Sequence, residues 1–299
     1  MDDPARWLPA VRAICAQHGL SVRSIQHLPQ ATNVVFGVDD VILKLYPPYW
    51  ARLASVERAV AERLRGRLPV ETPAVHAAGT FENWPYLVLG RLGGRSLHDV
   101  WQGMDDLEQR HIAAQLGEVL AELHRVPTVG LAELEADWPA LVDERVRGCV
   151  ERHREQGAAK AWLDQMPAFL ASAAPLYPRD FRPVIVSGDV HNYHLLVSEH
   201  YGRWQLTGLV DFDDARLGFE EYDLAAPGLF IMAGRPALLS TFLQAYGYAP
   251  SVLDQQLSRR LLAYTLLHRY RKLTWWLEEF VPGAPTTLEA LADTIYPFT

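Results

Sequence analysis

Two clusters of carboxylates in the second half of the chain each follow a short apolar run. Asp189 ends the sequence PVIVSGD, and Asp211 begins the acidic part of LVDFDD. The segment between them contains HLLVS and WQLTGLV, which is typical of a β-hairpin and would bring the two aspartates close together. Clustered carboxylates suit Mg²⁺, a hard cation that takes oxygen ligands and usually keeps water or phosphate oxygens as well. We therefore expect a magnesium site here, with two unrelated polar loop ends as the alternative.

The spacing of polar residues in this region is typical of a kinase catalytic loop. Such a loop carries a base aspartate, a metal-binding asparagine five residues later, and a second metal-binding aspartate after a short hairpin. Here the position five residues after Asp189 is His194, and Asp211 follows the predicted hairpin. We expect His191 to shape the loop, with a ligand role as the alternative. The spacing strengthens the prediction that metal and phosphate bind here.

Lys44 is the one charged residue in the run Val41–Tyr46, which is otherwise apolar and rich in strand-forming residues. A lysine buried in a strand needs a partner. Kinases use such a lysine to hold the α- and β-phosphates, and a glutamate on the next helix orients it. Glu57 lies in the predicted helix SVERAVAERL on the face that carries Leu64, so it should point inward; Glu62 is the competing partner. The alternative is a lysine on an edge strand that faces solvent.

The elements that must position these residues begin with a strand-rich segment. Within about the first ninety residues, five runs have the pattern of strands: VRSIQHL, NVVFGV, VILKLY, AVHAAGTF and YLVLGRL. We expect one helix before them, over about residues 4–18, and another at SVERAVAERL.

From Ser96 the pattern becomes mostly helical. We expect a helix capped by Asp105 or Asp106, two helices between residues 137 and 174, and further helices after about Phe219. The runs PVIVS, HLLVS and WQLTGLV are short strands between them. A β-rich part thus joins a helix-rich part near residues 89–94, which predicts an α+β protein of two lobes.

Composition excludes several classes of protein. The chain has 299 residues, of which 49% are hydrophobic and 21% charged, an ordinary globular balance. Its net charge of −8 argues against a nucleic-acid partner, because phosphate contacts need clustered Lys and Arg. Two cysteines, Cys15 and Cys149, are too few for a disulfide scaffold or a zinc site. The acidic start and the lack of a long apolar stretch predict a cytoplasmic protein with no membrane partner, and the oligomeric state stays open.

Longer motifs resemble those of the aminoglycoside phosphotransferase family, which are small-molecule kinases with a protein-kinase-like fold. The family's catalytic stretch, roughly H-G-D-x-H-x-x-N and three apolar residues, is similar to Ser187–Val197. Its stretch I-D-[aromatic]-x-x-A-x-x-G, which continues to D-[apolar]-A, is similar to Val210–Ala225. ERAVAERLRGRLPVETPAV and YLVLGRLGGRSL are similar to the helix-to-strand segment and the interlobe hinge, and AELHRVP is most similar to hygromycin-type members.

The resemblance covers nearly the whole chain and implies a protein-kinase-like two-lobed fold. The β-rich N-terminal lobe, which binds nucleotide, would span residues 1–92, and the helix-rich C-terminal lobe residues 93–299. The implied activity moves the γ-phosphate of ATP or GTP to a hydroxyl of a small molecule. Asp189 would be the catalytic base, Asp211 and His194 would bind Mg²⁺, and Lys44 would hold the α- and β-phosphates with Glu57 orienting it.

The remaining nucleotide contacts are implied by position within the same lobe. Thr32 and Asn33 lie between the first two strands, where kinases have their phosphate-covering loop. The backbone around Leu89 and Arg91 would take the purine edge. Asp223, in the second motif, is expected to brace the catalytic loop.

Two residues depart from the family's catalytic motif. Ser187 stands where the family usually has His, and His194 stands where it has Asn. Imidazole is a softer ligand than an amide oxygen and is not the first choice of Mg²⁺. Either His194 still binds the metal or a phosphate oxygen, or the second metal site is lost.

The acceptor stays open at this stage. Several acidic residues near the expected cleft would attract a polycationic aminoglycoside: Asp213, Asp214, Glu220, Glu221, Glu278 and Glu279. The basic residues between His268 and Lys272 argue against a purely acidic lining. The alternatives are a kinase of an amino alcohol or sugar, and a pseudokinase that binds nucleotide without transferring phosphate.

Overall fold

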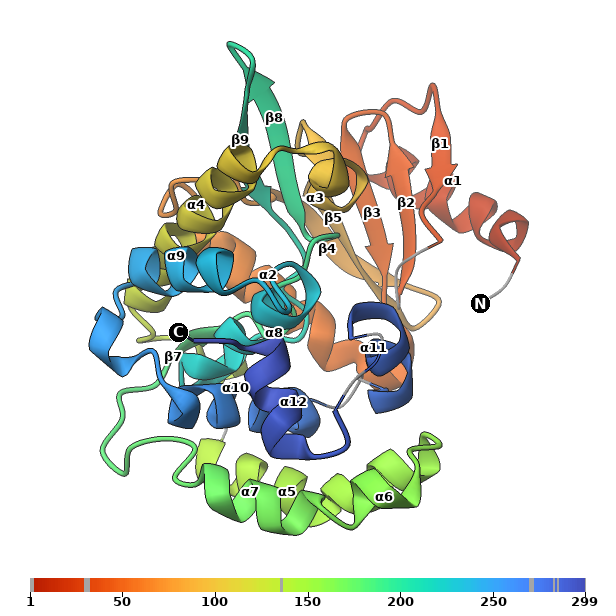
Figure 1. Ribbon diagram of the computed structural model, residues 1–299. Coiled ribbons are helices and arrows are strands. Elements are labelled where there is room, and N and C mark those ends of the chain that lie inside the picture. The colour runs from red at the N-terminus through yellow and green to blue at the C-terminus, as the bar shows by residue number, and fades with distance from the viewer. Residues whose placement is uncertain are drawn as a thin grey trace.

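In the computed structural model the described residues are 3–29, 33–134, 137–268, 272–281, 283 and 285–298. Within them the chain forms two lobes joined near residues 91–94, with the strands β1–β5 in one lobe and most of the helices in the other (Figure 1). None of the helices in these ranges combines the length and the apolar character that crossing a membrane requires.

A five-stranded antiparallel sheet forms the N-terminal lobe, with strand order β1-β2-β3-β5-β4. Its strands are β1 (Ile25–His27), β2 (Val34–Val38), β3 (Val41–Leu45), β4 (Val75–Phe81) and β5 (Trp84–Gly90). They confirm the five runs expected from the sequence. The opening helix is also confirmed, as a 3₁₀ turn at Pro4–Trp7 followed by α1 (Leu8–Gln17).

Side chains of β5 alternate between the two faces of this sheet, as the two-residue period of a strand requires. Tyr86 and Val88 join the cluster that includes α1. Leu87 and Leu89 point to the opposite face and pack with Ala54 of α2 (Ala51–Leu64). The sheet is therefore covered by α1 on one face and by α2 on the other.

The C-terminal lobe contains two small sheets and ten helices within the described ranges. Its strands are β6 (Arg95–Ser96), β7 (Val184–Val186), β8 (Leu195–His200), β9 (Arg203–Leu209) and β10 (Arg216–Gly218). Its helices are α3 (Leu97–Val100), α4 (Asp106–Arg125), α5 (Trp138–Glu155), α6 (Lys160–Leu163), α7 (Met166–Ala173), α8 (Glu221–Phe230), α9 (Pro236–Tyr246), α10 (Gln255–Leu267), α11 (Leu273–Phe280) and α12 (Leu288–Ile295). Further 3₁₀ turns span Pro48–Trp50, Trp101–Gly103, Ala132–Leu134 and Pro250–Val252.

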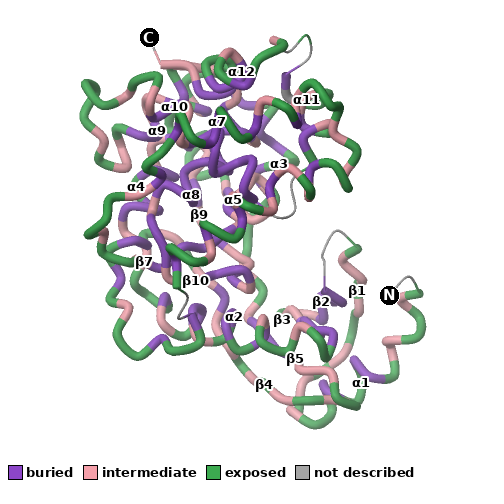
Figure 2. The backbone as a smooth tube through the Cα atoms, turned by 90° about the horizontal axis from the view of Figure 1, so that it is seen from below, coloured by how far each residue is buried: buried purple, intermediate pink, exposed green. Residues whose placement is uncertain are grey.

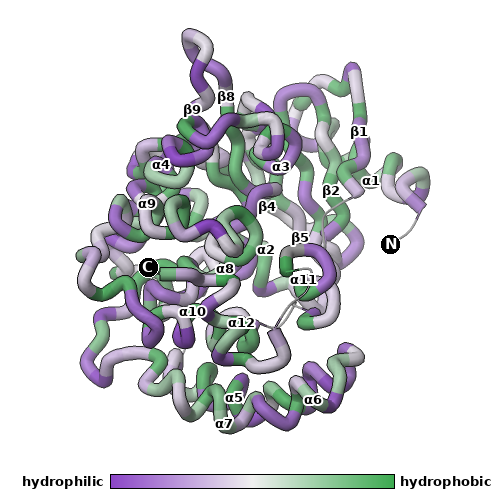
Figure 3. The backbone as a smooth tube through the Cα atoms, viewed as in Figure 1, coloured by the Kyte–Doolittle hydropathy of each residue, from purple (hydrophilic) through white to green (hydrophobic). Residues whose placement is uncertain are grey.

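The core of this lobe lies around α4, α8 and α10. Figure 2 shows the buried stretches concentrated there, and Figure 3 shows hydrophilic residues at the projecting tip of the β8–β9 hairpin. Helices α4 and α9 pack very closely, since a Cβ on Gly117 would lie 2.3 Å from the carbonyl oxygen of Phe242. Only a glycine permits that approach.

The structure settles one alternative and corrects one prediction in this lobe. Asp105, not Asp106, caps α4, accepting from the N–H groups of Leu107 and Glu108 while Glu108 accepts from the N–H of Asp105. Three helices, not two, lie between residues 137 and 174, because the four-residue α6 is too short to leave a periodic pattern. The same reason explains why β10, three residues long, was not expected. The division after residue 92 stays a proposal.

Candidate active site

Lys44 and Glu57 meet in the N-terminal lobe as the sequence predicts. Lys44 lies on β3 with its side chain 5% exposed, and its Nζ is 2.7 Å from Glu57 Oε2. Glu57 shares the buried face of α2 with Val60, and the hydroxyl of Tyr46 also donates to its carboxylate. The competing Glu62 is half exposed and bonds to Arg58 instead. Lys44 is therefore an inward-facing lysine with a fixed partner.

Two further carboxylates from the other lobe reach the same ammonium group. Lys44 Nζ lies 2.7 Å from Asp211 Oδ1 and 3.0 Å from Asp213 Oδ2. Asn33 Nδ2 donates to Asp213 Oδ2 at 2.7 Å. Buried Phe212 anchors the turn between the two aspartates, and Asp211 takes a φ of +69°, a left-handed conformation that is uncommon for non-glycine residues.

This cluster holds more negative than positive charge. Burial opposes the charge of Lys44, but Asp211 and Glu57 outweigh it and hold the lysine pKa well above its usual value. Burial raises the pKa of Asp213 to about 7, and the neighbouring carboxylates of Asp211 and Glu57 add to this effect. Three carboxylates around one ammonium fit a divalent cation, which would neutralise the excess charge.

The loop at residues 187–194, which the sequence predicts to be catalytic and which we call the catalytic loop, is held through its backbone. The N–H groups of Ser187 and Gly188 donate to the two carboxylate oxygens of Asp223 at 2.7 and 2.8 Å. His268 Nε2 donates to the carbonyl of Gly188 at 2.8 Å. Gly188 has a φ of +86°, and a Cβ there would lie 2.8 Å from the carbonyl oxygen of Asp214. The geometry confirms that Asp223 braces the loop that presents Asp189.

His194 bridges the two acidic clusters. Its Nδ1 donates to the carbonyl of Asp189 at 2.9 Å, so in the neutral ring Nε2 carries the lone pair. That Nε2 lies 3.5 Å from Asp211 Oδ2. Pairing of Leu195 with Leu209 in the β8–β9 hairpin fixes this register, as the sequence predicts. Two acceptors that face each other in this way are suited to a cation between them.

His191 lies beside His194, with ring centroids 3.9 Å apart. Its Nδ1 accepts the N–H of Tyr193, and its Nε2 is 3.5 Å from Asp189 Oδ2. One potential ligand atom from each of Asp189, His191 and His194 lies within 4.8 Å of the others. The expectation that His191 shapes the loop agrees with its contact to Tyr193, and its closeness to Asp189 keeps the ligand alternative open.

The remaining predicted nucleotide contacts have mixed outcomes. Thr32 lies outside the described residues. Asn33 joins the Lys44 cluster through Asp213. Leu89 is buried on β5, and Arg91 bends back, its N–H donating to Asp40 and its guanidinium to Asp39. The backbone N–H of Arg91 is thus already engaged, and a contact of the backbone around these two residues with a purine stays a prediction.

Asp213 is the residue of this cluster that sequence reasoning misplaced. It was expected among acidic residues that line the acceptor site, yet its carboxylate contacts Lys44 and Asn33. Its spacing from Asp211 gives no reliable signal, because the turn between them is irregular and Asp211 has a left-handed backbone conformation.

A cavity of about 610 Å³ begins at Asp189 and lies between the catalytic loop and α11. We call it the acceptor cavity. Aromatic side chains dominate its wall: His98, Trp101, His191, Tyr193, Phe230, His268 and Trp275. The structure confirms a cleft between Asp189 and the helix of Trp275, and the binding of an acceptor there stays a prediction.

The expectation of an acidic lining is wrong for most of the proposed residues. Among the described residues only Glu279 and Asp189 bring carboxylates to the acceptor cavity. Asp214 is buried next to Arg216, and Glu221 is paired with Arg260 at 2.8 Å. Glu278 does not line the cavity, and Glu220 opens into a different one. Among the expected basic residues, 269 and 271 lie outside the described ranges.

Solved structures of known phosphotransferases share this fold. A GDP complex of aminoglycoside 2'-phosphotransferase-IIIa matches with a TM-score of 0.74 at 19% identity, covering 96% of this chain and 98% of that one. Macrolide 2'-phosphotransferase MphH from Brachybacterium faecium matches with a TM-score of 0.63 at 23% identity, covering 97% and 99%. A streptomycin–ATP complex of APH(2")-IIa matches with a TM-score of 0.63 at 12% identity, covering 95% and 98%.

The family match extends through both lobes. A model described as the phosphotransferase enzyme family matches residues 25–259, from β1 into α10. That range contains Lys44, Glu57, Asp189, Asp211 and Asp223, the residues whose contacts build the site. The chain therefore belongs to the phosphotransferase enzyme family.

Proposed function

We propose that this protein transfers the γ-phosphate of ATP or GTP to a hydroxyl group of a small molecule. The observation that carries the proposal is the position of Asp189. Its carboxylate opens into the acceptor cavity, while its carbonyl oxygen is bonded to His194, whose other ring nitrogen faces Asp211. A hydroxyl in the cavity and a phosphate at the Lys44 cluster would therefore meet at Asp189.

Each residue has a separate task in this proposal. Asp189 takes the proton of the attacking hydroxyl, and Lys44, oriented by Glu57, holds the phosphates. Asp211 and His194 would hold Mg²⁺, and Asp213 is close enough to contribute. When bound, the metal would neutralise phosphate charge. Such a site works by positioning and charge compensation, with little covalent work for the protein.

The lining of the acceptor cavity supports a substrate with an apolar face. Solved relatives include an aminoglycoside and a macrolide phosphotransferase. A polycationic aminoglycoside needs several carboxylates, whereas the described wall offers Glu279 and Asp189 among many aromatic rings. Aromatic walls favour apolar groups or a single ammonium group. We therefore propose an acceptor with a hydroxyl, an extended apolar face and at most one positive charge, as in macrolides.

Nucleotide binding without transfer is the second candidate. The observation that favours it is Ser187, whose buried hydroxyl has no hydrogen-bond partner in the described part of the chain. However, Asp223 holds this position through the backbone N–H, so the side chain of Ser187 is not needed to fix the loop. Phosphate transfer is the better supported function.

The test uses Mg²⁺ with labelled ATP or GTP and a panel of macrolides, aminoglycosides, amino alcohols and sugars. We expect labelled product from a member of the apolar class. Asp189→Asn should lower turnover by about 10²- to 10⁴-fold and keep the thermal stabilisation that Mg²⁺–nucleotide gives. Asp164→Asn, on the exposed surface of the helical lobe, is the matched control. Near-normal turnover in Asp189→Asn would contradict the assignment.

A further inference from the structure

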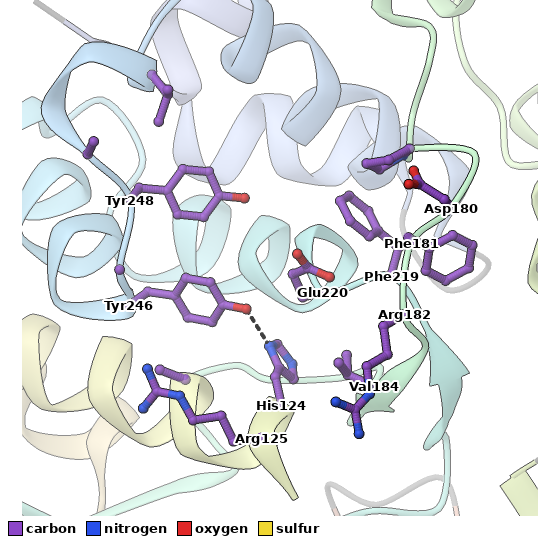
Figure 4. Close-up of a pocket in the computed structure, with 15 residues that line it drawn as sticks. His124, Arg125, Asp180, Phe181, Arg182, Val184, Phe219, Glu220, Tyr246 and Tyr248 are labelled. Atoms are coloured by element: carbon purple, nitrogen blue, oxygen red, sulfur yellow. Dashed lines mark hydrogen bonds between the residues drawn. The ribbon is translucent and has the colours of Figure 1, made fainter. Parts of the chain in front are cut away.

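A second cavity, of about 810 Å³, lies in the C-terminal lobe and shares no lining residue with the acceptor cavity. It is formed by the end of α4, the segment before β7, the start of α8 and the segment after α9 (Figure 4). The proposed phosphate transfer uses none of its residues. We call it the Glu220 recess, after the carboxylate at its centre.

Four aromatic rings surround that carboxylate. Figure 4 shows Glu220 between Tyr246 and Tyr248 on one side and Phe181 and Phe219 on the other. Glu220 is partly buried, and this burial raises the pKa of its carboxyl, although a hydrogen bond from its own backbone N–H opposes the shift. A partly desolvated carboxylate among aromatic rings is stabilised by a cation that enters the recess.

The two tyrosines also present acceptors to the recess, because their protons are used elsewhere. His124 Nε2–H donates to Asp223 Oδ2 at 3.2 Å, so His124 Nδ1 accepts from the Tyr246 hydroxyl at 2.8 Å. The Tyr248 hydroxyl donates to Glu221 at 3.1 Å. Burial raises the pKa of both phenols, so they stay neutral. A ligand that contacts these two hydroxyl groups must therefore supply the donors.

Charges on the rim restrict the ligand further. Figure 4 places Arg125 on the Tyr246 side and Arg182 on the Phe181 side. Arg125 bonds to Glu122 at 2.6 Å, and exposed Asp180 adds one negative charge at the edge. Two arginines repel a ligand with several positive charges, whereas the rings attract one ammonium group through their faces and bury an apolar body.

A continuous hydrogen-bond chain connects this recess with the catalytic loop. The chain runs from Tyr246 to His124 (2.8 Å), from His124 to Asp223 (3.2 Å), and from Asp223 to the N–H groups of Ser187 and Gly188 (2.7 and 2.8 Å). Asp189 is the next residue. A ligand that moves the Tyr246 hydroxyl thus changes the support of the loop that carries the proposed base.

We propose that the Glu220 recess is a regulatory site for an organic ion with a single ammonium group and an apolar body, and that its occupancy reaches Asp189 through Tyr246, His124 and Asp223. The regulatory part rests on the proposed phosphotransferase function. Binding itself does not, so the two are tested separately.

Binding is tested by calorimetry with phenethylammonium and hexylammonium, and with 2-phenylethanol as the neutral counterpart. We expect saturable binding of the ammonium ions, and binding weaker by about tenfold or more for the alcohol and for Glu220→Gln. Glu279→Gln is the matched control, because it removes the same charge from the acceptor cavity. Loss of binding in Glu279→Gln but not in Glu220→Gln overturns the site, and so does an absence of saturable binding to the unmodified protein.

Coupling is tested with Tyr246→Phe, which keeps the ring and removes the hydroxyl. In the unmodified protein, saturating phenethylammonium should change kcat by about fivefold or more, and in Tyr246→Phe this response should shrink while binding persists. Amide hydrogen exchange at residues 186–190 should change on binding in the unmodified protein and should change less in Tyr246→Phe. This measurement does not require an acceptor. An equal response in both proteins, or binding that changes neither kcat nor exchange, overturns the coupling. Changed exchange in a protein that transfers no phosphate would contradict the proposed function and leave the recess standing.

Discussion

The Lys44 cluster and the catalytic loop are held together by different kinds of contact. In the cluster every contact joins two side chains, from Lys44 to Glu57, Asp211 and Asp213. In the loop the decisive contacts join one side chain, Asp223, to backbone N–H groups. A site of the first kind depends on residue types at every position. A site of the second kind tolerates different side chains where only the N–H is used, as at Ser187.

The largest effect is expected from Lys44→Met. Removing the ammonium leaves one buried and two partly buried carboxylates without their shared cation, which should lower the free energy of unfolding by about 3–5 kcal/mol and turnover by at least about 10²-fold. Chemical denaturation and the nucleotide assay measure these effects. Lys160→Met, which breaks an exposed pair with Asp164, should change neither. Full activity in Lys44→Met would show that the cluster does not depend on this side chain. It would contradict the distinction drawn here between the cluster and the loop.

Asp223→Asn should have the next largest effect, and in a different parameter. The amide replaces one acceptor by a donor that faces backbone N–H groups, at a cost of about 1.5–3 kcal/mol in the free energy of unfolding. Because the change displaces the loop and leaves the Lys44 cluster intact, kcat should fall while KM for nucleotide stays close to normal. A rise in KM alone would show that Asp223 acts on the nucleotide and not on the loop.

Asp39 is a second carboxylate that accepts hydrogen bonds from backbone N–H groups, and it lies outside the active site. Its carboxylate accepts from the N–H groups of Arg23 and Ser24 at 3.0 and 2.9 Å, and these bonds lower its pKa to about 2. Since the folded pKa lies below the unfolded value, the carboxylate stabilises the fold above about pH 4, and this contribution is lost as the pH falls toward 2. Asp39→Asn should therefore have a lower Tm than the unmodified protein at pH 7. The difference should vanish near pH 2, and a difference independent of pH would contradict this.

Ser187→Ala should have the smallest effect. The hydroxyl it removes is buried without a partner in the described residues, so the free energy of unfolding should stay constant or rise by about 0–1 kcal/mol. Turnover should remain close to normal, since the backbone N–H is retained. A large loss of activity would mean that the loop depends on this side chain after all.

What the sequence predicts well is set by regular periodicity and by motif spacing. The 3.6-residue period places Glu57 on the inner face of α2, and strand register places His194 beside Val210. The direction of side chains in irregular turns has no such rule. Asp213 turns toward Lys44 because Asp211 has a left-handed backbone conformation. The residue types in this turn do not predict that conformation.

The acidic residues near the cleft show the same limit for charge. Glu220 and Glu221 are adjacent in sequence, but neighbouring residues on a helix do not share a face. One carboxylate opens into the Glu220 recess and the other bonds to Arg260. The number of acidic residues along the chain therefore overestimates the negative potential of the acceptor cavity. The aromatic wall depends on how α8 and α11 pack, which the sequence pattern does not predict.

Helix α2 belongs to both lobes, and this has a consequence for control. Val56, Val60 and Leu64 pack in the core of the helical lobe, and Arg52 and Arg63 donate to carbonyl groups there. Swinging the helix outward to separate Glu57 from Lys44 would expose three buried aliphatic side chains, at about 1.5 kcal/mol each or more. Fewer than about one molecule in a thousand would then hold the separated arrangement at rest. The lysine–glutamate pair therefore stays assembled, and any control of this protein must act at a place other than this pair.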